Sequence, residues 1–322
     1  MAVDPVLVRR LADEAGFLAT TLEKVARLED LLREIALHPR LGQHLALKGG
    51  TAINFVLLPE APRLSVDIDL NYLGEVGREE MLADRPIVEE ALERIFRAQG
   101  YGWRKRAPYG STAWTLRYTN IAATPDSVKV EVNWLLRVPI WITEQLPFRS
   151  IFPSEPAVVS VLAREEVVAG KLAALLDRAA PRDLFDVATL ANKGALGNPE
   201  KLRPAAVLLG SFHTEDFRER LERAHVGVIS ERDVRNALWP TLRRDVRPTL
   251  RELRKSAEPA LREILSLSDR ERAYLDAFYG ERRFDPLPLF EGTDPSADLP
   301  QHPMAAWRLQ QLTRRGKQVP GA

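Results

Sequence analysis

Cysteine is absent from this 322-residue sequence, and histidine is scarce, with five residues spread along the chain. Without cysteine, the chain cannot form disulfide bonds, thiolate zinc sites or a thiol nucleophile. Because histidine is so rare, the carboxylates of aspartate and glutamate are the side chains left to bind a metal ion, and carboxylates favour hard cations. The composition therefore directs the search for a metal site to acidic residues.

Long hydrophobic runs and a strong excess of one charge are also missing. No apolar stretch approaches the roughly 18 residues of a membrane helix, and the N-terminus shows no signal pattern, so we expect a cytoplasmic protein that does not bind a membrane. The formal net charge is only +1. Arginine nevertheless outnumbers lysine. The arginine guanidinium is suited to bidentate phosphate binding, but the codon bias of GC-rich genomes also produces a high arginine content.

Two glycines end a short apolar run at residues 45–47. The run is followed by the tetrapeptide Lys48, Gly49, Gly50 and Thr51. We expect Thr51 to cap a helix that runs to Leu58, and the N–H groups at the start of this helix could bind a phosphate. A tight turn with a threonine cap can also connect a strand to a helix without binding any ligand, so this segment alone does not establish a phosphate site.

A second strand is expected over residues 65–72. Because side chains alternate along a strand, Asp67 and Asp69 share one face, while Ile68 and Leu70 share the other and can enter a core. Two carboxylates on one face repel each other, and a divalent cation removes this repulsion; Mg²⁺ is usually held by one or two carboxylates together with substrate phosphates. The pair predicts a metal site, with a solvated strand face as the structural alternative.

The remainder of the first half mixes helix and strand patterns. Helices are expected from the Asp4 cap to Gly16, from a Thr20-x-x-Glu23 capping box to residue 38, and over residues 86–99, where Gly100 follows. Residues 114–118 and 128–134 alternate between apolar and polar side chains, which predicts further strands. We therefore expect an α+β fold with a mixed, twisted sheet flanked by helices.

The last of these strands carries another carboxylate. Glu131 shares a polar face with Lys129 and Asn133, whereas the valines between them share the opposite face. The structural reading of this face is the exposed side of an antiparallel strand with alternating charges.

After residue 153 the pattern becomes helical. Helices are expected from residue 164 to the break at Pro181, then over residues 182–191, 199–209, 215–224, 231–238 and 241–253, and after a Ser268-x-x-Glu271 capping box. One face of the 241–253 helix would carry a basic stripe, either to bind RNA or as a solvated surface, made of Arg243, Arg244, Arg247, Arg251 and Arg254. Residues 284–303 are rich in proline, aspartate and glycine, which predicts an extended or mobile segment before a short basic helix over residues 307–315.

Two groups of motifs resemble a known family. The order Gly-Gly-Thr, Arg63, Ser65 and Asp67-Ile68-Asp69 resembles the first motif of the AbiEii/AbiGii toxin family, which includes the mycobacterial MenT toxins and belongs to the DNA polymerase β-like nucleotidyltransferases. Residues 165–187 resemble later motifs of that family, through Lys171, Arg178, Arg182, Asp183 and Asp186. The matches cover about residues 45–190, and the remaining C-terminal part carries no motif that we can assign.

The resemblance implies a polymerase β-like nucleotidyltransferase head, which we place over residues 1–152. The helical pattern predicts a domain over residues 153–283 that contributes Lys171 and Asp186 to the cleft, and the composition predicts an extended tail with a short basic helix over residues 284–322. It implies catalytic roles for Asp67, Asp69, Lys171 and Asp186, with Asp67 and Asp69 holding Mg²⁺ or Mn²⁺. It implies substrate binding by Lys48, Gly49, Gly50, Thr51, Ser65, Glu131 and Arg182. Polymerase β-like enzymes generally use a third carboxylate on a neighbouring strand, for which Glu131 is the best-placed residue.

The resemblance also implies a function. We expect a monomeric toxin that transfers a nucleotidyl group from a nucleoside triphosphate (NTP) to RNA, with the 3′ end of tRNA as the expected acceptor, and thereby blocks translation and growth. A cognate antitoxin is the expected protein partner. Two alternatives stay open: transfer to a protein or a small molecule, and a non-catalytic nucleotide-binding module. Fold analogy does not choose among them.

Overall fold

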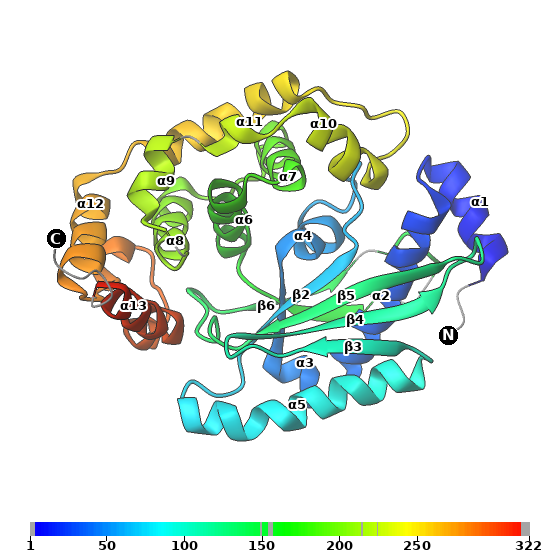
Figure 1. Ribbon diagram of the computed structural model, residues 1–322, viewed down its shortest axis with the longest axis horizontal. Coiled ribbons are helices and arrows are strands. Elements are labelled where there is room, and N and C mark those ends of the chain that lie inside the picture. Colours follow the sequence, from blue (N-terminus) through cyan, green and yellow to red (C-terminus); the bar gives the residue numbers. More distant parts are fainter. Residues whose placement is uncertain (1–3, 149, 154–156, 214, 224, 317–322) are drawn as a thin grey trace. The chain divides into compact units, whose positions relative to one another are not determined.

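The computed structural model describes residues 4–148, 150–153, 157–213, 215–223 and 225–316 (Figure 1). Taken over these described residues, the chain forms two compact units. Unit 1 comprises the N-terminal part to Arg137, Thr143–Leu162 and Glu231–Thr249, and unit 2 comprises Val138–Ile142, Ala163–Ser230 and the part from Leu250 onward. No helix among the described residues is both long enough and apolar enough to cross a membrane.

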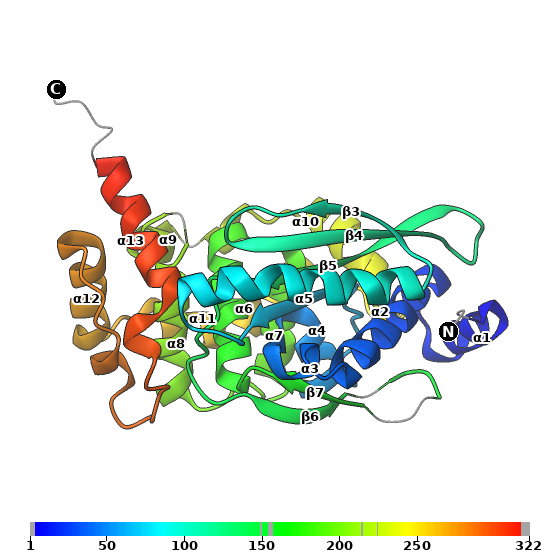
Figure 2. The same ribbon diagram turned by 90° about the horizontal axis from the view of Figure 1, so that it is seen from below.

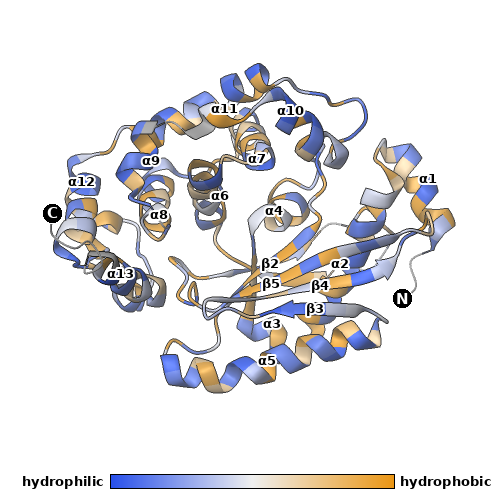
Figure 3. Cartoon of the chain, in the orientation of Figure 1, coloured by the Kyte–Doolittle hydropathy of each residue, from blue (hydrophilic) through white to orange (hydrophobic). Residues whose placement is uncertain are grey.

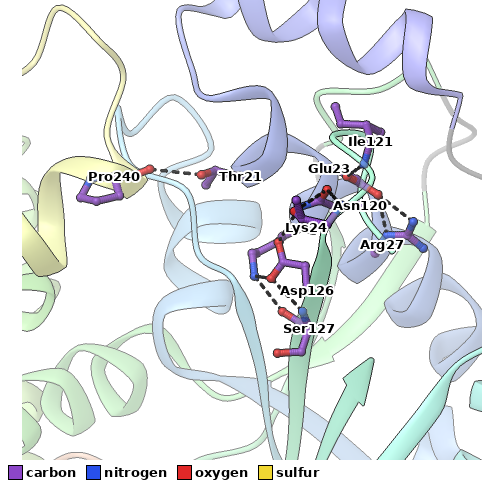
Figure 4. A network of polar contacts seen from close by, with 10 residues as sticks. Thr21, Glu23, Lys24, Arg27, Asn120, Ile121, Asp126, Ser127 and Pro240 are labelled. Carbon is purple, nitrogen blue, oxygen red and sulfur yellow. Dashed lines mark hydrogen bonds and ion pairs between the residues drawn. The ribbon is translucent and has the colours of Figure 1, made fainter. Parts of the chain in front are cut away.

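Two helices open unit 1. Helix α1 (Pro5–Ala15) begins as predicted, because the Asp4 side chain accepts a hydrogen bond from the Val6 N–H, and it ends at Gly16 in the left-handed conformation. Helix α2 (Ala19–Leu37) begins at Ala19, so the capping box predicted at Thr20 is wrong. The carboxylate of Glu23 accepts hydrogen bonds instead from the Arg27 guanidinium and from the backbone N–H of Ile121 (Figure 4).

The same surface of α2 is tied to the sheet and to a distant segment of unit 1. The Lys24 ammonium forms an ion pair with Asp126 and donates a hydrogen bond of 2.8 Å to the Ser127 carbonyl, while the Thr21 hydroxyl donates to the Pro240 carbonyl at 3.2 Å (Figure 4). These contacts fix α2 against the strand that carries Glu131.

A mixed sheet of seven strands, in the order β3-β4-β5-β2-β1-β7-β6, forms the centre of unit 1. The strands are β1 (Leu45–Lys48), β2 (Asp67–Tyr72), β3 (Gly102–Arg106), β4 (Ser111–Thr119), β5 (Pro125–Asn133), β6 (Glu144–Phe148) and β7 (Ala157–Val161). Strands β2 and β5 are parallel, as are β1 and β7, and the other neighbours are antiparallel. The predicted mixed sheet is therefore confirmed, and it contains more strands than those named from the sequence.

Helices α2 and α5 (Arg78–Ala98) lie on one face of this sheet, and Figure 2 shows α5 running across it. The hydrophobic side chains of that face are fully or almost fully buried: Ile68, Leu70, Trp114, Leu116, Val128, Val130 and Val132. Helix α5 begins two turns before the predicted start at Pro86, which lies inside the helix. Its early turns are held by buried Met81 and by Asp84, whose carboxylate accepts a hydrogen bond of 2.7 Å from the Tyr72 hydroxyl.

Short helices and an irregular segment complete unit 1. They are α3 (Leu41–His44), α4 (Gly49–Ala52), the π-helical turn η1 (Ile53–Leu57), α10 (Glu231–Asp233), η3 (Val234–Leu238) and η4 (Trp239–Thr241). After η4 the chain pairs with the loop before β2, because the Leu64 N–H donates to the Thr241 carbonyl and the Arg243 N–H donates to the Pro62 carbonyl, both at 2.9 Å.

The helix predicted over residues 241–253 is therefore wrong, and so is the arginine stripe on it. The backbone hydrogen bonds of this segment go to the loop at residues 62–64, and the next helix starts only at Leu250. The Arg243 guanidinium forms an ion pair with Asp245, and the Arg247 guanidinium donates to two backbone carbonyls. These arginines therefore do not form one helical face.

Unit 2 is helical, as predicted for the C-terminal region. Its main helices are α6 (Arg164–Arg178), α7 (Pro181–Asn192), α8 (Pro199–Ser211), α9 (Phe217–Arg223), α11 (Leu250–Leu265), α12 (Asp269–Asp276) and α13 (Pro303–Gly316). Shorter turns are η2 (His225–Val228), η5 (Ala277–Glu281), η6 (Leu287–Phe290) and η7 (Leu299–Gln301). The capping box at Ser268 and Glu271 is confirmed; residue 224, at the end of the helix expected over 215–224, lies outside the described residues.

The segment expected to be extended or mobile, residues 284–303, contains two helical turns and is packed within unit 2, where Leu289, Phe290 and Leu299 are buried. The division into folding domains at residues 1–152, 153–283 and 284–322 stays a prediction, and residues 317–322 lie outside the described part. By contact, strand β7 and the segment Glu231–Thr249 belong with unit 1.

One buried carboxyl of α2 gives a prediction for stability. Burial raises the pKa of Glu29 from 4.5 to about 7, although its carboxylate accepts hydrogen bonds from the Ser150 hydroxyl and the Ile151 N–H. Between these two pH values the folded protein binds more protons than the unfolded chain, so stability falls as the pH rises through this window. We expect Glu29→Gln to be more stable than the parent protein at about pH 8, by up to about 3 kcal/mol, and nearly equal at about pH 4.5. Urea denaturation at both pH values measures this, and parallel pH profiles of the two proteins would contradict it.

Candidate active site

The predicted metal site lies on the face of the sheet opposite α2 and α5. Asp69 pairs in register with Lys48 on β1 and with Glu131 on β5, and Asp67 pairs with Lys129 on β5. Directly paired residues on neighbouring strands project from the same face of a sheet. The structure therefore brings these five side chains to one surface, with Asp67 and Asp69 side by side on β2 as the alternation predicted.

The glycine corner lies directly against one of these carboxylates. Gly49 has a φ of +70°, in the left-handed region that glycine tolerates best. A Cβ added at Gly49 would stand 2.8 Å from Oδ2 of Asp69, which is closer than real side chains approach. Both the backbone conformation and the space around it therefore require glycine here, and the β1–α4 corner meets the Asp69 carboxylate.

Thr51 does not cap the helix, so that expectation is wrong. Helix α4 begins at Gly49 and its N-terminal cap is Lys48, without a side-chain hydrogen bond. Thr51 lies inside the helix and is buried, with its hydroxyl 2.9 Å from the Ser65 hydroxyl and bonded to the Asp67 carbonyl. Thr51 and Ser65 thus tie α4 to the start of β2 and fix the backbone that carries Asp67.

Lys129 also belongs to this surface, although it was not identified as a site residue from the sequence. Its ammonium forms an ion pair with Glu131. Burial alone would lower the pKa of Lys129, but Glu131, Asp69 and Asp67 outweigh burial and raise it above the usual value. A lysine held among three carboxylates supplies a positive charge to the face. The alternation at Lys129 and Glu131 was visible in the sequence, whereas their placement beside β2 depends on the sheet register.

The donor set fits a hard divalent cation held by two carboxylates. Asp67 and Asp69 offer oxygen ligands on one strand face, and the Glu131 carboxylate is engaged by Lys129. Among the described residues, no three histidine, aspartate or glutamate side chains are grouped so that they could hold a metal ion together. Mg²⁺ is usually bound in this way, by two protein carboxylates, with substrate phosphates and water as its other ligands.

Unit 2 contains a buried charge cluster where the sequence pointed to Lys171 and Asp186. The Lys171 Nζ lies 2.9 Å from Oδ1 of Asp183 and 3.1 Å from Oδ2 of Asp186, and the Arg178 Nε lies 2.7 Å from Oδ2 of Asp183. The Lys171 side chain is 8% exposed, and the two aspartates are 1% and 2% exposed. Burial acts to raise the pKa of Asp183, but Lys171 and Arg178 lower it to about 2.

The cluster joins two helices, because Lys171 and Arg178 belong to α6 and both aspartates belong to α7. It is therefore not a surface charge pattern within a single helix. Arg182, in the first turn of α7, is half-buried. The catalytic role of Lys171 and Asp186, and the substrate-binding role of Arg182, stay predictions.

Gly49 gives a direct test of the carboxylate geometry. We expect Gly49→Ala to weaken Mn²⁺ binding about 10–100-fold, because its new methyl group displaces the Asp69 carboxylate. Gly100→Ala is the matched control, since Gly100 also has a positive φ, +79°, but has no atom within 4 Å of an added Cβ. Both variants should lose about 1–2 kcal/mol of stability from the backbone strain. Equal Mn²⁺ affinities in a titration of the two variants would contradict this geometry.

Comparisons with known proteins agree with the observed architecture. The chain is similar to MenT4, a nucleotidyltransferase toxin from Mycobacterium tuberculosis H37Rv, with a TM-score of 0.63 over 90% of this chain and 99% of that one; at 17% identity this shows a common fold. A search of curated proteins gave no match. The family described as "Nucleotidyl transferase AbiEii toxin, Type IV TA system" matches residues 30–276, which is more than half of the chain. The chain therefore belongs to the AbiEii family of nucleotidyltransferase toxins of type IV toxin–antitoxin systems.

Proposed function

We propose that this toxin transfers a nucleoside monophosphate from an NTP to an RNA acceptor, with the 3′ end of tRNA as the acceptor that the family resemblance suggests, and so blocks translation and growth. The observation that supports this most strongly is the pair Asp67 and Asp69 on one strand face, with the Gly49 corner against Asp69. In this proposal the toxin acts as a monomer in the cytoplasm and is neutralised by a cognate antitoxin.

Asp67 and Asp69 would hold Mg²⁺ or Mn²⁺, which when bound supplies charge neutralisation at the phosphates and lowers the pKa of the attacking hydroxyl. The backbone of Gly49 and Gly50 allows close approach of the triphosphate, and Lys48 adds a positive charge on the same face as Asp69. Thr51 and Ser65 keep the Asp67 backbone in place through their hydroxyl contacts. In our proposal Glu131 keeps Lys129 over this face, rather than serving as a third ligand.

The proposed reaction is an in-line displacement. A ribose hydroxyl oxygen of the acceptor forms a bond to the α-phosphorus, its proton is lost to solvent or to a carboxylate, and the bond between the α-phosphorus and the β-phosphate oxygen breaks to release pyrophosphate. In our proposal Lys171 neutralises phosphate charge and Asp186 orients it, as the resemblance implies. Little covalent chemistry is required of the protein, because positioning and charge stabilisation supply most of the rate enhancement.

The test is incubation of the purified toxin with each NTP in turn, labelled at the α-phosphate, together with Mg²⁺ and total RNA. We expect label on one size class of RNA from one preferred NTP, and no label with Asp67→Asn/Asp69→Asn. Label found on a protein or a small molecule would show that this alternative acceptor, and not RNA, receives the nucleotide. Failure to transfer label from any NTP would favour a nucleotide-binding module without catalysis.

A further inference from the structure

We propose that the open face of strands β3 and β4 binds the phosphate backbone of the RNA acceptor through Arg104, Arg106 and Arg117. The choice of RNA rests on the proposed function, whereas the arginine surface itself follows from the sheet register and from the contacts of these residues. This arginine surface takes the place of the stripe that the sequence suggested near residue 243.

The register puts the arginines on the same face as the two aspartates. Arg104 pairs with Thr115, Thr115 pairs with Lys129, and Lys129 pairs with Asp67. One row further along, Arg106, Ala113, Glu131 and Asp69 are successive partners. Arg117 lies two residues beyond Thr115 on β4 and therefore projects from this face as well. Figure 1 shows these strands side by side.

The residues between the arginines confirm this orientation, because they point the other way. Lys105 forms ion pairs of 2.7 Å with Glu89 and 2.8 Å with Glu93, both on α5. Trp103 packs against Phe96 of the same helix. Since neighbouring residues of a strand point to opposite faces, Arg104 and Arg106 must point away from α5.

All three arginines are exposed, and their guanidinium groups form no hydrogen bond or ion pair with any other described residue. Many exposed arginines elsewhere are engaged: Arg10 pairs with Glu14, Arg94 with Glu90 and Arg262 with Glu258. Three unengaged guanidinium groups on one surface repel each other and favour an anionic ligand. Guanidinium is suited to phosphate because its planar fork can donate two parallel hydrogen bonds.

The dimensions fit a nucleic acid strand that ends at the aspartates. Arg104 and Arg106 are two residues apart on one strand, about 7 Å, so neighbouring phosphates can meet one arginine each. Three strand spacings, about 14 Å in total, separate Arg104 from Asp67. On β4 the two rows pass through Thr115 and Ala113, whose small side chains leave room for an RNA strand above the sheet. On β5 they pass through Lys129 and Glu131, which form an ion pair with each other. Figure 3 shows that the edge strand β3 is more hydrophilic than the central strands β2 and β5.

An acidic protein could also bind arginines, but RNA fits better because the surface continues to the proposed reaction site. An acceptor must reach from the reacting hydroxyl outward across the neighbouring strands, and its phosphates recur along its whole length. If the partner were a protein, nothing would require the part of this face at Asp67 and Asp69 to stay accessible.

The test compares two triple variants with the same change in net charge. Arg104→Gln/Arg106→Gln/Arg117→Gln removes the arginine surface, and Arg10→Gln/Arg94→Gln/Arg262→Gln removes three exposed, ion-paired arginines. Binding of fluorescently labelled total tRNA is measured over a range of salt concentrations. We expect the first variant to reduce the slope of log affinity against log salt by about two to three, and the second to leave it unchanged. In the transfer assay, the KM for RNA should rise at least about tenfold while kcat and the KM for NTP stay the same.

An unchanged salt slope in the first variant, or an equal change in both variants, would overturn the proposal. Loss of antitoxin binding with normal tRNA binding would overturn it too, because the surface would then serve a protein partner. The binding measurement needs neither NTP nor metal. A toxin that binds tRNA through these arginines but labels no RNA would therefore refute the proposed function and not the arginine surface.

Discussion

Asp69→Asn is expected to reduce nucleotidyl transfer by at least about 10³-fold, with the stability of the protein nearly unchanged. The Asp69 carboxylate lies against the Gly49 corner and beside Asp67, where metal and triphosphate would meet. Asparagine keeps the shape but lacks the negative charge that holds a divalent cation. A factor of 10³ corresponds to about 4 kcal/mol of lost transition-state stabilisation.

Glu131→Gln is the control variant for this result. The Glu131 carboxylate is engaged by Lys129, so we expect its loss to reduce transfer less than about tenfold. Initial rates at saturating NTP and RNA, together with circular dichroism of each variant, measure both effects. Equal losses in Asp69→Asn and Glu131→Gln would show that three carboxylates hold the metal, and normal activity of Asp69→Asn would exclude the metal role altogether.

Lys171→Met is expected to destabilise the protein by about 3–5 kcal/mol, because it leaves buried carboxylates without their shared lysine. Lys171 lies within 3.1 Å of both Asp183 and Asp186, and all three side chains are at least nine-tenths buried. Arg178 still compensates Asp183 in the variant. Urea denaturation at neutral pH measures the change, and a loss below about 1 kcal/mol would contradict this account.

A double variant separates stability from catalysis at this cluster. Lys171→Met/Asp186→Asn removes one positive and one negative charge, so it should recover most of the lost stability. If this stable double variant does not transfer the nucleotide, the cluster takes part in the reaction as the family resemblance implies. Recovery of transfer would show that Lys171 and Asp186 only hold α6 to α7.

The parts of the fold that local sequence determines were predicted well. The Asp4 cap and the terminal Gly16 of α1 depend on neighbouring residues alone, and so does the alternation that puts Asp67 and Asp69 on one face. The helical character of unit 2 also follows from local periodicity. The start of α12 follows from the local capping box at Ser268. Each of these features depends on residues within a few positions of one another, so the local sequence was enough to predict it.

The errors arise where distant segments decide the structure. The chain after Thr241 pairs with the loop at residues 62–64, so Arg243, Arg244 and Arg247 lie outside any helix. Thr51 and Glu23 found partners far away in sequence, Ser65 and the N–H of Ile121, in place of the caps that their positions suggested. The closeness of Lys129 to Asp67, and of Gly49 to Asp69, required the strand order, which no local pattern contains.

The most direct test of the central claim is a crystal structure of the toxin with Mn²⁺ and a non-hydrolysable NTP, in which anomalous scattering locates the metal. The account predicts Mn²⁺ bound to carboxylate oxygens of both Asp67 and Asp69, with the triphosphate against the Gly49–Gly50 corner. A metal and nucleotide bound elsewhere, with the two aspartates taking no part, would contradict it.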